Sequence, residues 1–194
     1  MSNTKSRSTR RSSEGFTLIE LMITVAIVAV LAVLAAVGMA SFLKAGKTAE
    51  VTATLQGIRG AEETWYNDHA STQYLDISGA GGTAAVTAWF PAGTPSDQKV
   101  VWDTSSCAST TCTNFKKLGV NVNTYVYYRY GGAAGNAGGI PSTKPKLATG
   151  VTNPTVTTPW YFLEAYGDLN GNGTYSDYYT SSWNTTVNSI NPEE

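Results

Sequence analysis

A single carboxylate, that of Glu20, lies near the start of an otherwise apolar run. The run reads GFTLIELMITVAIVAVLAVLAAVGMASFLK over residues 15–44, and no charged residue follows Glu20 until Lys44. A carboxylate at membrane depth is costly unless a cation or hydrogen-bond donors pair with it. The chemistry that this position predicts is therefore charge pairing in an apolar environment.

A group of oxygen-bearing residues in the second half of the chain has the spacing of a cation site. Residues 168–177 read DLNGNGTYSD, with Gly173 at the sixth place. This order matches the first half of a calcium loop, although the twelfth place holds Tyr179 instead of a bidentate glutamate. The ligands expected for a weakly bound calcium ion are Asp168, Asn170, Asn172, Asp177 and the backbone carbonyl of Thr174.

The same segment also has a structural interpretation, which we favour. Asn-Gly dipeptides between two strand-like runs are the strongest short-range signal for a β-hairpin turn. Only two of the five candidate ligands are charged, so a bound calcium ion would be held weakly. We therefore expect no cofactor, with a weakly bound calcium ion as the alternative.

Cys107 and Cys112 are the only two cysteines of the chain. In an oxidising compartment such a pair is expected to form a disulfide. The enclosed Ala-Ser-Thr-Thr would be a small surface loop. A structural zinc site needs about four ligands, and the chain adds only one histidine, His69, to the two cysteines. We therefore expect a disulfide and no zinc site.

No arrangement of residues in the sequence points to catalysis. His69 stands alone near the expected end of a helix, where it is expected to be structural or exposed. Glu62 and Glu63 are consecutive, so their side chains leave a helix in different directions and do not form a working carboxylate pair. We expect that the protein is not an enzyme.

The first element that must position Glu20 is the apolar run itself. It is longer than the apolar core of about 7–15 residues in a secretory signal peptide, and it reaches the about 20 residues that a bilayer span requires. Basic residues precede it, and positive charge favours the cytoplasmic side of a membrane. These basic residues are Lys5, Arg7, Arg10 and Arg11. The alternatives are a signal peptide cut near Gly38-Met39-Ala40 and a permanently anchored single-pass protein.

The helix is expected to continue beyond the membrane. There is no proline and little turn chemistry between Lys44 and Asn67. A stripe with a spacing of three or four residues lies on one face of such a helix. Its members are Val51, Leu55, Ile58, Glu62 and Trp65. We expect this stripe to pack on the sheet of the same chain, and the helix to end near Asp68.

Strand-like patterns occupy the rest of the chain. β-branched and aromatic residues are frequent in four runs, residues 99–103, 125–130, 160–166 and 178–183. Residues 78–98 and 131–159 are rich in Gly, Ala, Thr and Pro and are expected to form loops. We expect an antiparallel sheet of about four strands packed on the C-terminal half of the helix, which is an α+β fold.

Six consecutive residues begin the apolar run, namely Gly15, Phe16, Thr17, Leu18, Ile19 and Glu20. Together with the run, they resemble the N-terminus of the type IV pilin-like family, which comprises major pilins, minor pilins and the pseudopilins of type II secretion. The resemblance implies that a prepilin peptidase cuts between Gly15 and Phe16 and that Phe16 is then N-methylated. The sequence departs from the family at Val37, where many members have proline, and at Glu14, where a basic residue is frequent.

A charge pairing for Glu20 follows from this cut. The free amine of Phe16 would be a cation at neutral pH, four residues before Glu20, and the two could pair within one chain. In a bundle of staggered helices, Glu20 of one subunit could instead meet the amine of its neighbour. That pairing would neutralise two buried charges and set the axial offset between subunits.

The cut also defines the expected organisation of the chain. Residues 1–15 would be a cleaved cytoplasmic leader and residues 16–43 a transmembrane or filament-core helix. Residues 44–70 would be the amphipathic half of the helix, and residues 71–194 an extracytoplasmic globular head. Without the leader the chain has 9 basic and 13 acidic residues, a net charge of −4. A negative chain is not expected to bind nucleic acid.

The resemblance implies a structural subunit of a type IV pilus or related filament that polymerises through its N-terminal helix. The implied partners are other pilin subunits, the prepilin peptidase, the membrane and an inner-membrane assembly platform. The precursor would lie in the inner membrane, and the product in a cell-surface filament or the periplasm. The alternatives are a type II secretion pseudopilin and a membrane-anchored calcium- or sugar-binding module that does not polymerise. Adhesion, motility, DNA uptake and secretion remain open as the role of the filament.

Overall fold

The computed structural model of the protein describes residues 15–69, 73–79, 81, 86–122, 125–138, 153 and 155–192. The chain divides inside its first helix into two compact units, Met1–Phe42 and Leu43–Glu194. In chain order the elements are α1 (Leu18–Asp68), β1 (Val100–Val101), α2 (Thr110–Lys117), β2 (Tyr125–Val126), β3 (Arg129–Gly135), β4 (Trp160–Gly167), β5 (Ser176–Ser181) and β6 (Asn188–Ile190).

The described part of the first unit is the apolar portion of α1, with three residues ahead of it. Leu18–Ala36 has a mean hydropathy of 2.8, and none of it is buried. By length and composition this portion is able to cross a membrane. The transmembrane segment predicted over residues 16–43 stays a prediction, and a helix of suitable length lies there.

The second unit begins with the remaining part of α1, which buries one side against a sheet. Four members of the predicted stripe are 0–1% exposed, namely Val51, Leu55, Ile58 and Glu62. Trp65 is half-buried. The helix ends at Asp68, as the sequence predicted. The predicted amphipathic pattern of this part of α1 is therefore confirmed.

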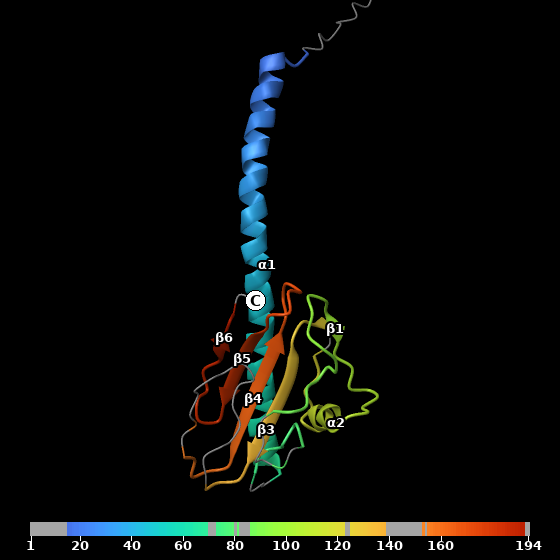
Figure 1. The fold of residues 1–194 in the computed structure, drawn as a ribbon, viewed down its shortest axis with the longest axis vertical. Coiled ribbons are helices and arrows are strands. Elements are labelled where there is room, and N and C mark those ends of the chain that lie inside the picture. Colours follow the sequence, from blue (N-terminus) through green and yellow to red (C-terminus); the bar gives the residue numbers. More distant parts are fainter. Residues whose placement is uncertain are drawn as a thin grey trace, which may run out of the picture. The chain divides into compact units, whose positions relative to one another are not determined.

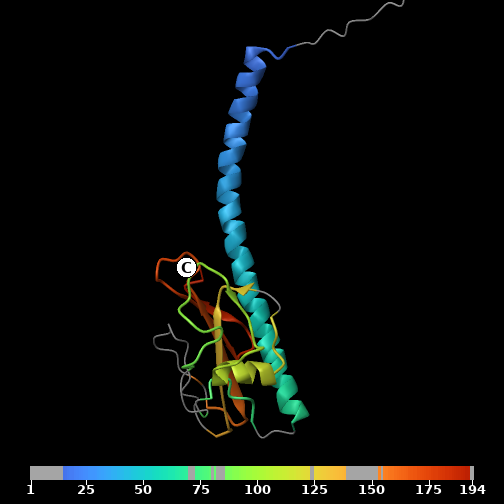
Figure 2. The ribbon, with the colours of Figure 1, turned by 90° about the vertical axis from the view of Figure 1, so that its right-hand side faces the viewer.

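The partner of this helix is an antiparallel sheet with the strand order β3-β4-β5-β6. The part of α1 in this unit runs along one face of the sheet (Figure 1, Figure 2). Tyr130 of β3, Leu163 and Ala165 of β4 and Tyr178 of β5 share one buried cluster with the helix stripe. The predicted α+β fold is confirmed.

The four runs predicted as strands agree with the observed strands to different extents. Residues 160–166 and 178–183 correspond to β4 and β5. The run at residues 125–130 divides between β2 and β3, and the run at residues 99–103 contributes only β1. β1 and β2 pair with each other in a separate two-stranded sheet. The short strand β6 was not predicted.

The loop predicted over residues 131–159 is wrong at its start, because β3 extends to Gly135. A Cβ on Gly132 would lie 2.8 Å from Leu163 Cδ2 and 2.9 Å from Ile77 Cδ1. Neighbouring apolar side chains thus occupy the space that a side chain of β3 would fill. This strand therefore lacks the β-branched residues by which a strand is identified from sequence. In the other predicted loop, Phe90 forms an isolated bridge with Tyr130.

Helix α2 was also missed, since the segment around the cysteines was expected to be a surface loop. The Ser109 side chain caps the helix by accepting a hydrogen bond from the Cys112 N–H at 3.2 Å. Phe115 is fully buried in the main cluster, and Cys112 is buried beside it. Burial of this apolar side stabilises a helix that is too short to be stable by itself.

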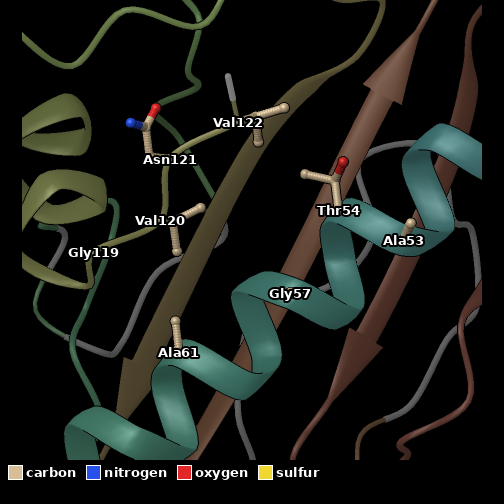
Figure 3. A pocket seen from close by; sticks show the side chains of 8 residues that line it. All are labelled: Ala53, Thr54, Gly57, Ala61, Gly119, Val120, Asn121 and Val122. Atoms are coloured by element: carbon tan, nitrogen blue, oxygen red, sulfur yellow. The ribbon is translucent and has the colours of Figure 1, made fainter. Parts of the chain in front are cut away.

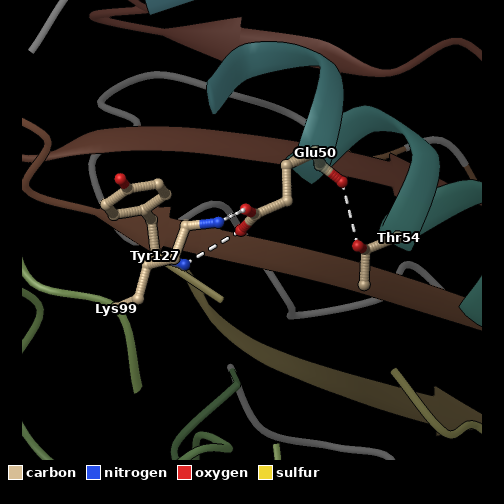
Figure 4. A network of polar contacts seen from close by, with 4 residues as sticks. All are labelled: Glu50, Thr54, Lys99 and Tyr127. Atoms are coloured by element: carbon tan, nitrogen blue, oxygen red, sulfur yellow. Dashed lines mark hydrogen bonds and ion pairs between the residues drawn. The ribbon is translucent and has the colours of Figure 1, made fainter. Parts of the chain in front are cut away.

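Polar contacts fix α1 to the loops of its unit. Glu50 Oε1 accepts a hydrogen bond from the Tyr127 N–H at 2.9 Å, and Glu50 Oε2 lies 3.3 Å from Lys99 Nζ (Figure 4). Within the helix itself, the Thr54 hydroxyl donates to the Glu50 carbonyl at 2.9 Å (Figure 4). One turn earlier, Lys47 Nζ donates to the Leu169 carbonyl at 2.8 Å. These contacts add directional bonds to the apolar packing of the helix.

Candidate functional site

The predicted processing residues lie just ahead of α1. Gly15, Phe16 and Thr17 are outside the helix, and the Phe16 side chain is 86% exposed. The peptide bond between Gly15 and Phe16 is therefore outside regular secondary structure. Cleavage at this bond and methylation of Phe16 stay predictions.

Thr17 and Glu20 form a reciprocal capping arrangement at the start of α1. Glu20 Oε2 accepts hydrogen bonds from the Thr17 N–H at 2.9 Å and from the Thr17 hydroxyl at 2.7 Å. In return, Thr17 Oγ1 accepts a hydrogen bond from the Glu20 N–H at 3.3 Å. This is the capping box in which a threonine N-cap and a glutamate three residues later satisfy each other's backbone donors.

The capping box gives Thr17 a role that the sequence analysis missed. The signal was present, because Thr-Leu-Ile-Glu has the threonine-to-glutamate spacing of a capping box before an apolar run. The box holds one carboxylate oxygen of Glu20 within the chain. In the part of the chain that the structure describes, the second oxygen, Oε1, accepts no hydrogen bond. An amine or another donor can therefore reach Glu20 without breaking the cap.

The predicted pairing of Glu20 with the amine of Phe16 stays a prediction. That amine exists only after cleavage, since the nitrogen of Phe16 otherwise belongs to the peptide bond with Gly15. What surrounds Glu20 is an exposed apolar helix, with Ile19 and Leu21 more than half exposed beside it. Exposure of such an apolar surface to water is unfavourable. The arrangement is able to hold a charge pair once a second apolar surface covers it.

The predicted disulfide is present, and it joins Cys107 to Cys112 with an S–S distance of 2.04 Å. It lies in the second unit and links the residues before α2 to the first turn of that helix. It therefore belongs to the packing of this second unit, Leu43–Glu194, which is called the head from here on, and not to the site around Glu20.

The candidate calcium ligands lie in and after the turn that joins β4 to β5, so the hairpin interpretation is confirmed. Asp168 Oδ1 accepts from the Gly171 N–H at 2.7 Å, and Oδ2 accepts from the Gly173 N–H at 2.9 Å. The two asparagine side chains bond to the backbone in the same manner: Asn170 Oδ1 accepts from the Asn172 N–H, and Asn172 Oδ1 from the Thr174 N–H.

Asp177 stands apart from the turn, within β5 and opposite Tyr166 of β4. Among the residues that the structure describes, no group of three or more His, Cys, Asp and Glu side chains is placed to hold a metal ion. The predicted ligand set relies on amide and carbonyl oxygens, so calcium binding stays a prediction.

The other titratable residues considered in the sequence do not converge. His69 is exposed and stacks on Trp65 with 3.7 Å between ring centroids. Glu62 is fully buried and accepts from the Leu75 N–H, whereas Glu63 accepts from the hydroxyls of Tyr74 and Tyr161. The two glutamates therefore have separate partners, as their adjacency predicted.

Comparison with known proteins identifies the segment that contains the capping box. Residues 10–36 match the family described as the prokaryotic N-terminal methylation motif. No curated protein and no solved structure matches the chain significantly. The matched segment includes Gly15, Phe16, Thr17 and Glu20 and extends through the exposed apolar helix. The N-terminal part of this chain thus carries the prokaryotic N-terminal methylation motif, the signature of type IV prepilin-like proteins.

Proposed function

We propose that the protein is a prepilin whose mature form is a structural subunit of a type IV pilus or related filament. The observation that carries this proposal is Glu20: a lone carboxylate on the exposed and otherwise uncharged portion of α1, Leu18–Ala36, inside the matched motif. A charge in such a place needs a partner, and an exposed apolar helix needs a cover. Packing of several such helices side by side supplies both.

A second surface supports assembly through helices. Six small residues form one exposed stripe along α1 in the head, beside the exposed Gln56 and Asn67, and this stripe is called the small-residue face: Gly46, Ala49, Ala53, Gly57, Gly60 and Thr64. This small-residue face carries no charge, whereas the water-exposed face of a helix is usually polar and charged. Small side chains allow the backbone of another helix to approach closely.

Part of the small-residue face borders a groove of about 400 Å³. Ala53, Thr54, Gly57 and Ala61 of α1 form one wall, and residues 119–122, which follow α2, form the other (Figure 3). The side chains of Val120 and Val122 extend toward the helix from that wall (Figure 3). An uncharged, partly apolar groove of this kind suits packing against an apolar segment of another subunit.

The proposal implies partners and a location. The precursor would be anchored in the inner membrane, and the peptidase would cut between Gly15 and Phe16. The mature subunit would then join other subunits at an inner-membrane assembly platform and reach a cell-surface filament or the periplasm. A type II secretion pseudopilin would use the same segment in the same manner, and it is the alternative within this class.

The proposal is tested by the N-terminus and by one substitution. In native material we expect a methylated Phe16, detected by mass spectrometry, in filaments sheared from the surface. Glu20→Ala should leave cleavage intact and abolish assembly, because the apolar bundle loses its charge pair. Thr24→Ala, which also removes a polar side chain from this helix, is the matched control and should assemble.

Each opposing result has a clear meaning. A methylated Phe16 found only in membranes would favour a minor subunit or a pseudopilin. An intact leader, or a cut near Ala40, would contradict the prepilin proposal and favour an anchored or secreted binding module. Normal filaments from the Glu20→Ala variant would contradict the assigned role of this carboxylate.

A further inference from the structure

A buried carboxyl group in the head has no role in the proposed assembly. Glu62 lies on the buried side of α1 and is 0% exposed. Its Oε2 accepts a hydrogen bond from the Leu75 N–H at 3.0 Å. Its Oε1 is buried and has no hydrogen-bond partner among the residues that the structure describes. An ionised carboxylate can accept about four hydrogen bonds, so a single donor leaves the charged form poorly satisfied.

The charges around Glu62 do not compensate for its burial. The charged groups that act on it are Glu63 of α1 and Asp76 of the following segment, and both are acids. Arg59, one turn earlier, directs its guanidinium to Gln56 and to the Thr185 carbonyl. On the other elements, the hydroxyl of Tyr161 in β4 donates to Glu63, and the lysines of α2, Lys116 and Lys117, are exposed.

Burial is the main cause that raises the pKa of Glu62 to about 8, and the negative charges of Asp76 and Glu63 raise it further. The hydrogen bond from the Leu75 N–H lowers the pKa, but its effect is smaller than that of burial. The geometry leads to the same conclusion, because one donor and two neighbouring acids favour a neutral carboxyl group.

The donor to Glu62 belongs to a short strap, defined here as residues 74–78. Two further hydrogen bonds join the strap to helices: the Tyr74 hydroxyl donates to Glu63 Oε2 at 3.1 Å, and Asn114 Nδ2 of α2 donates to the Asp76 carbonyl at 2.8 Å. Asn114 Nδ2 also lies 3.3 Å from the Ile77 carbonyl. The Ser78 N–H donates to the Gly132 carbonyl of β3 at 2.8 Å. The strap has no regular secondary structure, and Glu62 and Glu63 of α1 both accept hydrogen bonds from it.

We propose that Glu62 is a proton-dependent clasp, which holds the strap on α1 while it is protonated and weakens that hold when it ionises. In the open state water solvates the carboxyl group, and its pKa returns to the ordinary value of 4.5. The equilibrium constant for closure of the strap is therefore highest below pH 4.5. Between that pH and the pKa of the closed state, the constant falls about tenfold per pH unit, and above that pKa it no longer changes.

The clasp can be measured on the full-length protein in detergent micelles. The observable is hydrogen exchange at the Leu75 amide between pH 5 and pH 9, corrected for the intrinsic rate. Protection should fall about tenfold per pH unit below pH 8 and then level off. In Glu62→Gln, which keeps an acceptor for the Leu75 N–H but does not ionise, protection should not depend on pH. Glu63→Gln is the matched control and should keep the slope of the wild type.

Two results would overturn the clasp. One is a pH-independent Leu75 amide in the wild type, and the other is an unchanged slope in Glu62→Gln. A second measurement does not require any variant to fold, namely the carboxyl carbon shift of isotope-labelled Glu62 in the wild type. A titration midpoint near 8 supports the clasp, and a midpoint near the ordinary value contradicts it. Neither measurement requires filaments, so the clasp stands or fails separately from the proposed assembly.

Discussion

At the scale of the residue, Glu20 and Thr17 show how one carboxylate can have two uses. In the capping box, Oε2 accepts from the Thr17 N–H, while Thr17 Oγ1 accepts from the Glu20 N–H. The box also leaves Oε1 without a hydrogen bond among the described residues. The carboxylate is thereby held in one orientation before any partner arrives, which reduces the ordering that a new contact requires.

This arrangement predicts that Thr17 supports the work of Glu20. Thr17→Val removes the hydroxyl that donates to Glu20 Oε2 and accepts from the Glu20 N–H, with little change in shape. Loss of an N-cap side chain costs about 1 kcal/mol of helix stability. We expect faster hydrogen exchange at the Glu20 amide in micelles and a lower yield of sheared filaments. Thr17→Ser keeps the hydroxyl and should behave as the wild type does.

The outcome that would contradict this prediction is specific. A valine variant with unchanged amide exchange would mean that the capping box does not form in the membrane. A valine variant with faster exchange but a normal filament yield would mean that the box stabilises the helix and that assembly does not depend on it.

At the scale of the element, α1 has two surfaces that do not suit water. Its apolar portion is exposed throughout, and its small-residue face in the head contains three glycines, Gly46, Gly57 and Gly60. A Cβ on any of these glycines would meet nothing within 4 Å. Glycine inside a helix costs about 0.5–1 kcal/mol relative to alanine. The packing within the chain therefore does not explain them, whereas close approach of another helix would.

The glycine at position 57 allows stability and assembly to be separated. Gly57→Ala should raise the free energy of unfolding of the subunit by about 0.5–1 kcal/mol, because helix propensity improves and no clash arises. Gly57→Leu should also leave the subunit folded, but its side chain would fill the groove and lower the filament yield. Chemical denaturation and shearing yield are the two measurements.

A matched control places the same bulk outside the groove. Gln56→Leu puts a leucine at the neighbouring exposed position of α1, and its filament yield should exceed that of Gly57→Leu. Equal yields from the two leucine variants would mean that the groove is not an assembly surface. A loss of stability in Gly57→Ala would mean that contacts within the subunit require this glycine.

At the scale of the whole molecule, the two units differ in what holds them together. Every buried residue of the two hydrophobic clusters lies between Val51 and Tyr178, within Leu43–Glu194. The described part of Met1–Phe42 has no buried residue. The head thus has its own core, whereas the apolar helix depends on a membrane or on other helices for its environment.

This division predicts that the head folds by itself. A chain of residues 43–194, exported to an oxidising compartment, should be soluble and should unfold cooperatively, with its disulfide formed. Its melting temperature should lie within a few degrees of that of the full chain in micelles. Circular dichroism and one-dimensional NMR provide the measurement. An aggregated or partly folded product would mean that the apolar portion of α1 contributes to the core.

The sequence was sufficient wherever neighbours along the chain decide the structure. The apolar run, the stripe from Val51 to Glu62 and the end of α1 at Asp68 follow from helical spacing and turn chemistry. The hairpin between β4 and β5 follows from its Asn-Gly dipeptides. The disulfide follows from the presence of only two cysteines. The capping box had a local signal as well, and it was overlooked.

Only the tertiary structure decided the features that depend on distant residues. β3 is a strand because it pairs with β4, with Ile77 and Leu163 packed against Gly132, whereas its own residues have little preference for a strand. α2 forms because Phe115 fills a place in the core. The periodicity placed Glu62 on the buried stripe, but the donor to its carboxyl group is the Leu75 N–H, beyond the end of the helix. Spacing along the chain determines which side of an element is apolar. Which residues pack against that side depends on contacts between distant parts of the chain, and a short stretch of sequence does not contain this information.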